Sequence, residues 1–168
     1  QSIVNSRRDG NRNCPFCSGT RVLTGFNDLA TTHPTLAVQW HPDRNGGLTP
    51  ELCAPGSGAA IWWRCDLGHE WRTTPASRTG PAASGCPYCT NKAVLPGYND
   101  LATTHPELAK QWHPTRNGAL TPRDIAAGSR RTIWWMCDRG HEWPAMGSNR
   151  ARLAVGCPDC APGGFRPN

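Results

Sequence analysis

The chain has 168 residues, of which only 37% are hydrophobic, and its 18 Gly and 16 Pro residues argue against one large packed core and for several small units. The formal charge is +6, and 16 of the 18 basic residues are Arg, which favours a polyanionic partner. No apolar run approaches the roughly 20 residues of a membrane span, and 1–13 lack the apolar stretch of a secretory signal, so we expect a soluble, cytoplasmic protein.

The first feature in chain order is the pair Cys14/Cys17, which recurs 72 residues later as a second Cys-Pro-x-Cys pair. The same offset relates 27–49 to 99–121, which match at 19 of 23 positions. The chain is therefore a tandem repeat. We predict four segments: 1–24, the tail of an incomplete upstream repeat; 25–96, module 1; 97–162, module 2; and 163–168, a C-terminal tail.

Each repeat is expected to begin with helical segments. In the first repeat, Asn27 or Asp28 suits a helix N-cap, and Pro34 suits the first turn of a second helix that ends near Trp40. The run Ile-Trp-Trp-x-Cys-Asp-x-Gly-His-Glu-Trp at 61–71 then predicts a β-hairpin whose turn presents a Cys and a His. The second repeat has the same pattern 72 residues later.

The cysteines, nine in all, occur mainly as Cys-x2-Cys pairs and Cys-x3-His turns, which is metal-ligand spacing rather than a disulfide framework. If each hairpin turn joins the Cys pair that follows it, the intervening loops have 16 and 15 residues. The reverse order would join Cys14/Cys17 to the first hairpin turn across 47 residues and leave the last pair unused. Short loops cost less entropy, so we favour the first grouping and treat Cys14/Cys17 as a partial site.

The predicted ligands of two structural Zn2+ ions are Cys65, His69, Cys86 and Cys89 in module 1 and Cys137, His141, Cys157 and Cys160 in module 2. We therefore predict a small α+β fold stabilised by metal, with tandem zinc-ribbon or treble-clef-like repeats. Each repeat would be a short helical lead plus a zinc-pinned β-hairpin. A Cys3His zinc site carries a net charge of about −1, so two sites would leave the chain at about +4.

The same donor sets argue against catalysis. Four N and S donors complete a tetrahedral zinc site and leave no open coordination position. Glu70 and Glu142 directly follow the ligand histidines and would suit a general base on a metal-bound water, but that chemistry needs an open position. We therefore expect no enzymatic activity.

The remaining Cys and His residues are expected to be structural. Cys53 corresponds to Ile125 in the second repeat, which favours a small buried apolar role. Four histidines precede proline next to helix ends, where a structural contact is favoured over a phosphate contact. These are His33, His41, His105 and His113.

The tryptophans and arginines carry the candidate binding surface. Trp62 and Trp63 are adjacent on a predicted strand and point to opposite faces, so one of the pair could stack on a base or pack on a protein partner, although core packing is favoured for most tryptophans. Arginines at repeated positions would give a basic surface for phosphates, although a solvated arginine or one paired with a carboxylate is the alternative for each. The candidates are Arg44, Arg78, Arg116, Arg130, Arg131, Arg150 and Arg152. Arg130, Arg131, Arg139 and Arg152 occur only in the second repeat, so uneven binding would favour module 2.

The run Gln-Trp-His-Pro-x-Arg-Asn-Gly-x-Leu-Thr-Pro, followed by Ile-Trp-Trp-x-Cys-Asp-x-Gly-His-Glu-Trp and Gly-Cys-Pro-x-Cys, resembles a bacterial family described as a probable zinc-ribbon domain. The resemblance covers about 27–89 and 99–160. It implies tandem zinc-ribbon or treble-clef modules, often joined to endonuclease domains similar to very-short-patch-repair nucleases, and hence DNA targeting. The chain itself has no nuclease-like acidic cluster.

Together these features predict a monomeric, zinc-stabilised module that binds nucleic acid, with DNA favoured, as the targeting part of a larger nuclease or defence system. The alternative is an adaptor for protein–protein interaction, in which the exposed tryptophan of each pair makes the contact. Arginines clustered on one face would favour the first function, and an apolar patch with scattered arginines would favour the second.

Overall fold

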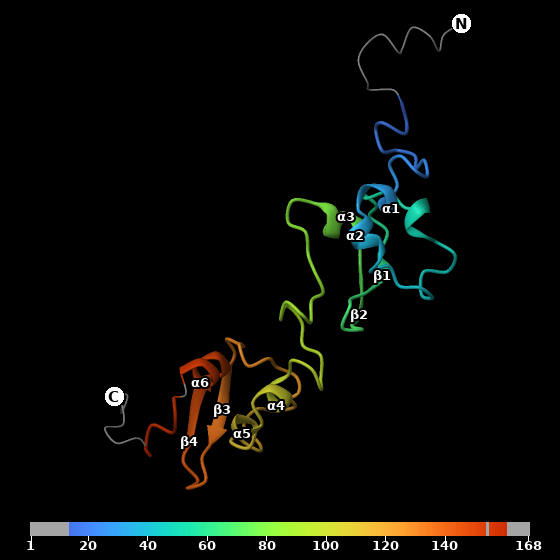
Figure 1. Cartoon of the computed structure of the whole chain (residues 1–168). Coiled ribbons are helices and arrows are strands. Elements are labelled where there is room, and N and C mark those ends of the chain that lie inside the picture. The colour runs from blue at the N-terminus through green and yellow to red at the C-terminus, as the bar shows by residue number, and fades with distance from the viewer. Residues whose placement is uncertain (1–13, 154, 161–168) are drawn as a thin grey trace, which may run out of the picture. The chain divides into compact units, whose positions relative to one another are not determined.

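The structure is a computed structural model that describes residues 14–153 and 155–160. Its contacts divide the chain into two compact units, Gln1–Pro87 and Tyr88–Asn168. Each unit contains the helices and the hairpin of one repeat, coloured blue to green in the first and yellow to red in the second (Figure 1). We keep the names module 1 and module 2 for 25–96 and 97–162. Among the described residues, no helix has the length and apolar character that crossing a membrane requires.

Two short helices lead each module, as predicted. In module 1 they are α1 (Leu29–Thr32) and α2 (Pro34–Ala37), and in module 2 they are α4 (Leu101–Thr104) and α5 (Pro106–Ala109). Asp28 is the N-cap of α1, and its carboxylate accepts hydrogen bonds from the Thr31 backbone N–H at 2.8 Å and hydroxyl at 2.7 Å. The backbone N–H groups in the first turn of a helix have no partner within the helix, and the bond from Thr31 satisfies one of them.

The second helix ends earlier than the sequence predicted. It stops at Ala37 rather than near Trp40, because 39–41 pairs with the hairpin instead. The Arg64 backbone N–H donates to the Gln39 carbonyl at 2.8 Å, and Trp40 forms an isolated antiparallel bridge with Trp63. The corresponding helix of module 2 ends at Ala109 for the same reason, since Trp112 bridges Trp135.

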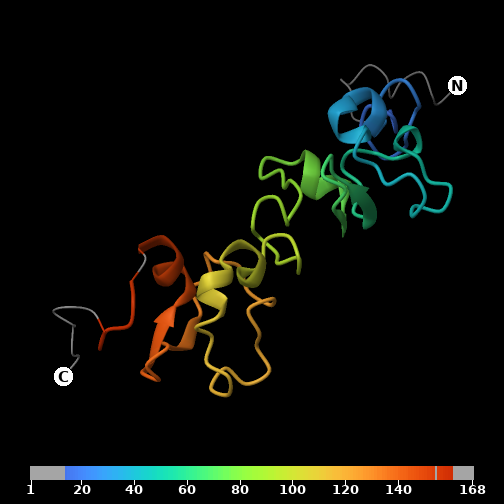
Figure 2. The same ribbon diagram turned by 60° about the horizontal axis from the view of Figure 1, so that its bottom comes forward.

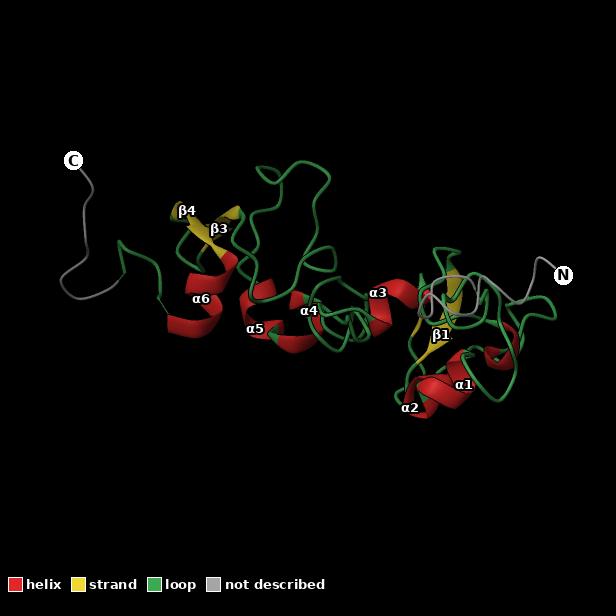
Figure 3. Ribbon diagram, turned by 90° about the horizontal axis from the view of Figure 1, so that it is seen from above, coloured by secondary structure: helices red, strands yellow, loops and turns green. Residues whose placement is uncertain are grey.

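A two-stranded antiparallel hairpin forms the centre of each module. The strands are β1 (Ile61–Arg64) and β2 (Glu70–Thr73) in module 1, and β3 (Thr132–Met136) and β4 (Glu142–Met146) in module 2. Long loops join the lead helices to the hairpins (Figures 2 and 3), and the loop of module 1 includes the short 3-10 helix η2 (Pro50–Leu52). The registers are equivalent, with Trp63 opposite Trp71 and Trp135 opposite Trp143.

A helix follows each hairpin, and the sequence analysis did not predict it. These helices are α3 (Pro75–Thr79) and α6 (Gly147–Leu153). Thr74 caps α3, because its side chain accepts a hydrogen bond from the Ser77 backbone N–H at 3.1 Å. In module 2, α6 packs against β4. Each of these helices carries one buried arginine, discussed below.

The core of each module is built on one tryptophan of the hairpin. Trp63 and Trp135 are fully buried. Each makes an edge-to-face contact with the tryptophan that follows the lead helices, with ring centroids 5.5 Å apart for Trp40 and 5.8 Å apart for Trp112. The indole N–H of Trp63 donates to the Thr73 carbonyl at 3.0 Å, so the buried ring leaves no polar atom unpaired. The adjacent Trp62 is only half-buried, as strand alternation predicted.

Candidate metal centres

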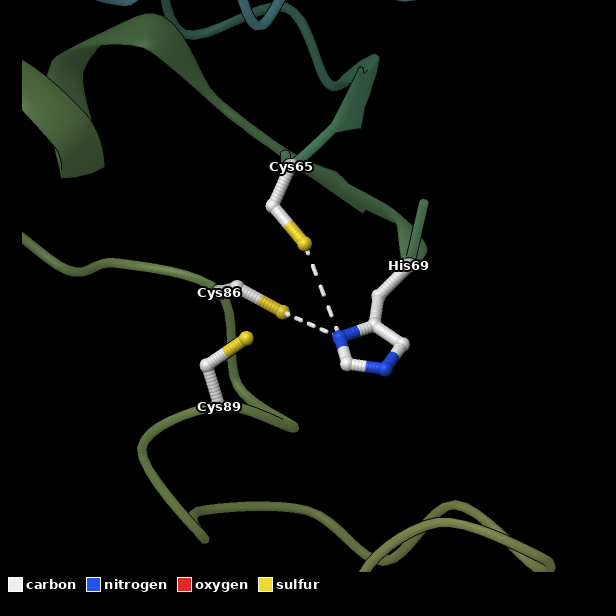
Figure 4. A group of neighbouring side chains, drawn as sticks. All are labelled: Cys65, His69, Cys86 and Cys89. Carbon is white, nitrogen blue, oxygen red and sulfur yellow. Dashed lines mark hydrogen bonds between the residues drawn. The ribbon is translucent and has the colours of Figure 1, made fainter. Parts of the chain in front are cut away.

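Four donors converge at the turn of the first hairpin. Cys65 directly follows β1 and His69 directly precedes β2, while Cys86 and Cys89 lie on the turn after α3. Their ligand atoms all lie within 4.8 Å of one another. Figure 4 shows the three sulfurs and the imidazole pointing toward one another, with His69 Nδ1 3.5 Å from Cys65 Sγ and 3.7 Å from Cys86 Sγ.

The second hairpin turn has the same arrangement. Cys137, His141, Cys157 and Cys160 place their ligand atoms within 4.8 Å of one another. His141 Nδ1 lies 3.3 Å from Cys160 Sγ and 3.6 Å from Cys157 Sγ, and the sulfurs of Cys137 and Cys160 are 3.8 Å apart. In both groups Nδ1 is therefore the imidazole nitrogen that faces the sulfurs.

These spacings fit tetrahedral zinc. With Zn–S near 2.3 Å and Zn–N near 2.0 Å, the edges of the tetrahedron are about 3.8 Å between sulfurs and about 3.6 Å between sulfur and nitrogen. The distances above match both values. Each group thus has the donor set and the size of a closed structural zinc site, with three thiolates and one imidazole.

The local backbone explains why Cys and His can meet across so short a turn. The Cys65 backbone N–H donates to the His69 carbonyl at 3.0 Å, and the Gly68 N–H donates back to the Cys65 carbonyl at 2.8 Å. Gly68 has a φ of 79°, a left-handed conformation that glycine adopts without steric cost. The turn therefore holds the first two ligands side by side, and the Cys-Pro-x-Cys turn supplies the other two.

The thiols of the second group differ in acidity. Desolvation would raise the pKa of Cys137, but hydrogen bonds that include the backbone N–H groups of Arg139 and His141 lower it to about 7. Desolvation and the neighbouring thiols Cys157 and Cys137 raise the pKa of Cys160 to about 11. Thiolates that crowd together in this way are stabilised by a divalent cation, and zinc binding at such a site releases protons.

The structure groups each hairpin turn with the Cys pair that follows it. Cys14 and Cys17 form a turn of the same kind, in which the Cys17 N–H lies 3.5 Å from Cys14 Sγ, but within the part of the chain that the structure describes they join neither group of donors. Asn27 donates to the carbonyl of Phe16 in this turn at 2.7 Å, as Asn99 donates to that of Tyr88 at 3.0 Å. The two Cys-Pro-x-Cys turns are thus anchored alike.

Cys53 and four histidines lie outside both donor groups and contact neighbouring residues of their own module. Cys53 is buried, lies outside both donor groups, and has a pKa raised by that burial. His33 and His105 each lie at hydrogen-bond distance from the hydroxyl of the preceding threonine. His41 is buried, and its Nδ1 accepts from the backbone N–H groups of Asp43 and Arg44 at 3.1 and 3.2 Å. His113 makes the equivalent contacts in module 2.

Glu70 has a role that the sequence analysis missed. Its Oε1 lies 3.0 Å from His41 Nε2, and its Oε2 lies 3.1 Å from Arg44 Nη1. The hydrogen bond from His41 and the charge of Arg44 hold the pKa of Glu70 below its usual range. Glu142 repeats the pattern with His113 and Arg116. The signal available in the sequence was the joint recurrence of His-Pro-x-Arg and His-Glu in both repeats.

The arginines separate into two classes. Arg44 and Arg116 are exposed and lie over the half-buried rings of Trp62 and Trp134, with 4.7 and 4.4 Å from the guanidinium carbon to the ring centroid. Three further candidates are also exposed: Arg130, Arg131 and Arg152.

The prediction that Arg78 and Arg150 bind phosphate is wrong. They are only 5% and 3% exposed, because each guanidinium is enclosed by two tryptophans of its own module, and they are not available to phosphate.

Comparison with known proteins identifies the repeated unit. A family described as a probable treble clef zinc finger domain matches the chain twice in tandem, at residues 36–92 and 108–163. Each match contains one complete donor group. A search of curated proteins found no match. Since the two matches cover more than half of the chain, it belongs to this treble clef zinc finger family, with one structural zinc site in each of two tandem copies.

Proposed function

We propose that the chain binds nucleic acid, with DNA as the preferred partner, and that the outer face of the first hairpin makes the main contact. This differs from the expectation that module 2 would dominate, because Arg64 and Arg72 lie on the hairpin of module 1. By outer face we mean the strand residues that point away from the core. In module 1 these are Trp62, Arg64, Glu70 and Arg72. The observation that carries the proposal is the concentration of arginines on this face around a half-exposed tryptophan.

The register places these residues as cross-strand neighbours. Trp62 lies opposite Arg72, and Arg64 lies opposite Glu70. Arg44 adds a third guanidinium from the preceding loop, stacked on Trp62. Three arginines against one glutamate leave the face basic, and Arg64 and Arg72 are exposed. Guanidinium groups bind phosphates in bidentate fashion, and a tryptophan ring offers a surface on which a base can stack.

The zinc ions have a structural role in this proposal. Each donor group supplies four ligands, which completes a tetrahedral site, and Glu70 and Glu142 are held by His and Arg rather than directed at the donors. We therefore propose a binding module without catalytic activity of its own. Its role would be to target a nuclease or a defence system to DNA.

Module 2 favours a second candidate function. Its outer face has Met136 where module 1 has Arg64 and Pro144 where module 1 has Arg72, next to Trp134. Met146 at the end of the same face is 42% exposed. Methionine and tryptophan are enriched in protein–protein interfaces. A protein partner that binds this face would make the chain an adaptor, either instead of the DNA function or together with it.

The test is nucleic-acid binding by the zinc-loaded chain, measured by fluorescence anisotropy with duplex and single-stranded probes across a salt series. We expect the affinity to fall steeply as salt rises, because bound phosphates release counterions. The double variant Arg64→Ala/Arg72→Ala should weaken binding and reduce the slope of log affinity against log salt by about 2.

The control is Arg21→Ala/Arg123→Ala, which removes the same charge from exposed positions outside the hairpins. Equal losses in the two double variants would refute the assignment to the outer face. Absence of salt-sensitive binding to every probe would refute the nucleic-acid function and leave the adaptor function. The adaptor function would be refuted in its turn if a protein partner bound the Met136→Glu chain as well as it binds the parent chain.

A further inference from the structure

Each module buries one arginine beside its zinc site. Arg78 lies on α3 and Arg150 on α6, and both side chains are almost completely removed from solvent. A guanidinium cannot lose its proton in a protein, so burial leaves a full positive charge that requires compensation.

The direct partners of Arg78 are neutral. Its Nη2 donates to Gln39 Oε1 at 2.6 Å, and its Nε donates to the Ser84 carbonyl at 3.3 Å. The guanidinium lies over two rings, 4.4 Å from the Trp63 centroid and 5.2 Å from the Trp71 centroid. Its Nη1 is buried without a hydrogen-bond partner, and among the residues described by the structure no carboxylate pairs with it.

Arg150 has the same surroundings in module 2. It donates to the Gln111 side chain and to the Val155 carbonyl, and its guanidinium lies 5.2 Å from the Trp135 centroid and 5.0 Å from the Trp143 centroid. Its Nε is buried without a hydrogen-bond partner. Neutral hydrogen bonds and ring contacts are therefore the direct environment of both arginines.

Each guanidinium binds a carbonyl that lies just before a zinc ligand: Ser84 is two residues before Cys86, and Val155 is two residues before Cys157. Burial lowers the pKa of Arg78, while the thiolates of Cys86 and Cys65 act in the opposite direction and stabilise its charged form. Cys157 does the same for Arg150, which lines one cavity together with Cys137, Cys157 and Cys160. Three thiolates and one Zn2+ carry a net charge of about −1, which a single arginine neutralises.

We propose that Arg78 and Arg150 are the counter-ions of the two zinc–thiolate centres. They are positioning residues, since neither is a ligand. Each adds a positive charge next to the thiolates, which stabilises the anionic, metal-bound state, and each ties the helix after the hairpin to the glutamine of the helical lead. This explains why an arginine occupies an apolar site between two tryptophans. The proposal rests on the zinc sites and not on nucleic-acid binding.

The experiment compares Arg78→Met with Arg78→Lys in the full chain. Methionine keeps an unbranched side chain beside Trp63 but removes the charge, whereas lysine keeps the charge. Zinc affinity is measured by competition with a chromogenic chelator. We expect Arg78→Met to weaken the module 1 site about tenfold, as is common for residues that support metal ligands, and Arg78→Lys to recover most of that loss. The module 2 site should be unchanged, and Arg150→Met should give the reverse pattern.

Cobalt substitution separates charge from packing. In the Co2+-loaded protein, the loss of a nearby positive charge raises the energy of the thiolate electrons, so Arg78→Met should shift the thiolate-to-cobalt charge-transfer band to longer wavelength. Gln39→Leu removes the hydrogen bond but not the charge and should leave the band in place. Equal zinc losses in the Met and Lys variants, or a Met variant with the parental affinity and band, would overturn the proposal. If Arg78→Met does not fold, a Lys variant that fails to hold zinc overturns it as well.

Discussion

The two modules share their interior and differ on their outer faces. The buried tryptophan, the arginine of the following helix, the His–Glu–Arg cluster and the four donors recur at equivalent positions. On the outer face of the hairpin, however, Arg64 and Arg72 of module 1 are replaced by Met136 and Pro144. Two copies of one zinc scaffold therefore present surfaces of different chemistry. The interior around the zinc site is shared, while the outward strand positions differ between the modules.

The donor groups themselves also differ in burial. In module 1 His69 is 9% exposed and Cys86 is buried as well, whereas in module 2 Cys157 is the one buried ligand. The helix after the hairpin is longer in module 2, and the ligand loop is one residue shorter. More exposed ligands give a chelator easier access, so the second site is expected to release its metal more readily.

The largest expected effect is the loss of one whole module. Cys137→Ser should unfold module 2 and reduce the zinc content from two ions to one, because so small a core cannot fold without its metal. Cys65→Ser should do the same to module 1. Zinc content and the dispersion of NMR signals from each module would show this. Cys53→Ala, at a buried thiol outside both donor groups, is the control and should keep both ions.

Two outcomes would contradict this view. A Cys137→Ser chain with two zinc ions and an unchanged melting profile would remove the ligand assignment. Loss of both modules from either single variant would show that the two units do not fold independently.

The sequence predicted the repeat, the N-caps, the hairpin and the grouping of the donors, because each depends on local spacing. Asp28 caps through the third residue after it, and Cys65 and His69 meet across a single turn. The helices after the hairpins were missed because they are short and begin with residues of low helix propensity, Pro in α3 and Gly-Ser-Asn in α6. At five residues α3 is too short to be stable by itself, and the helix is held by its cap and by the packing of Arg78.

The burial of Arg78 could not be predicted from a single position either. Arginine is mostly exposed in proteins, and the burial of Arg78 depends on contacts with residues far away in the chain, Gln39 and Trp63. The premature end of α2 has a similar cause, since Trp40 leaves the helix to pair with Trp63. Long-range pairing overrides local propensity in both cases.

An effect of intermediate size would sharpen the contrast between the outer faces. Met136→Arg places in module 2 the residue that module 1 has at Arg64, and it should strengthen nucleic-acid binding and increase the salt slope by about 1. Anisotropy titrations against the parent chain would measure this. The matched control is Leu153→Arg, at an exposed position of α6 outside the hairpin. If both substitutions strengthen binding equally, net charge rather than the outer face determines the affinity.

The smallest expected effect concerns the His–Glu–Arg cluster that the two modules share. Glu70→Gln and Glu142→Gln should each cause a small and equal destabilisation, because both carboxylates contact a buried His and an exposed Arg, and both are about one-third exposed.

A glutamate whose pKa is lowered by folding contributes stability above its ordinary pKa, and that contribution is lost as the pH falls through the folded value. The difference between each variant and the parent should therefore stay constant from neutral pH down to about 4.5 and shrink below it. Urea unfolding at matched zinc content would measure it, with Glu51→Gln as the exposed control. Unequal losses in the two modules would show that the shared cluster does not stabilise the two modules alike.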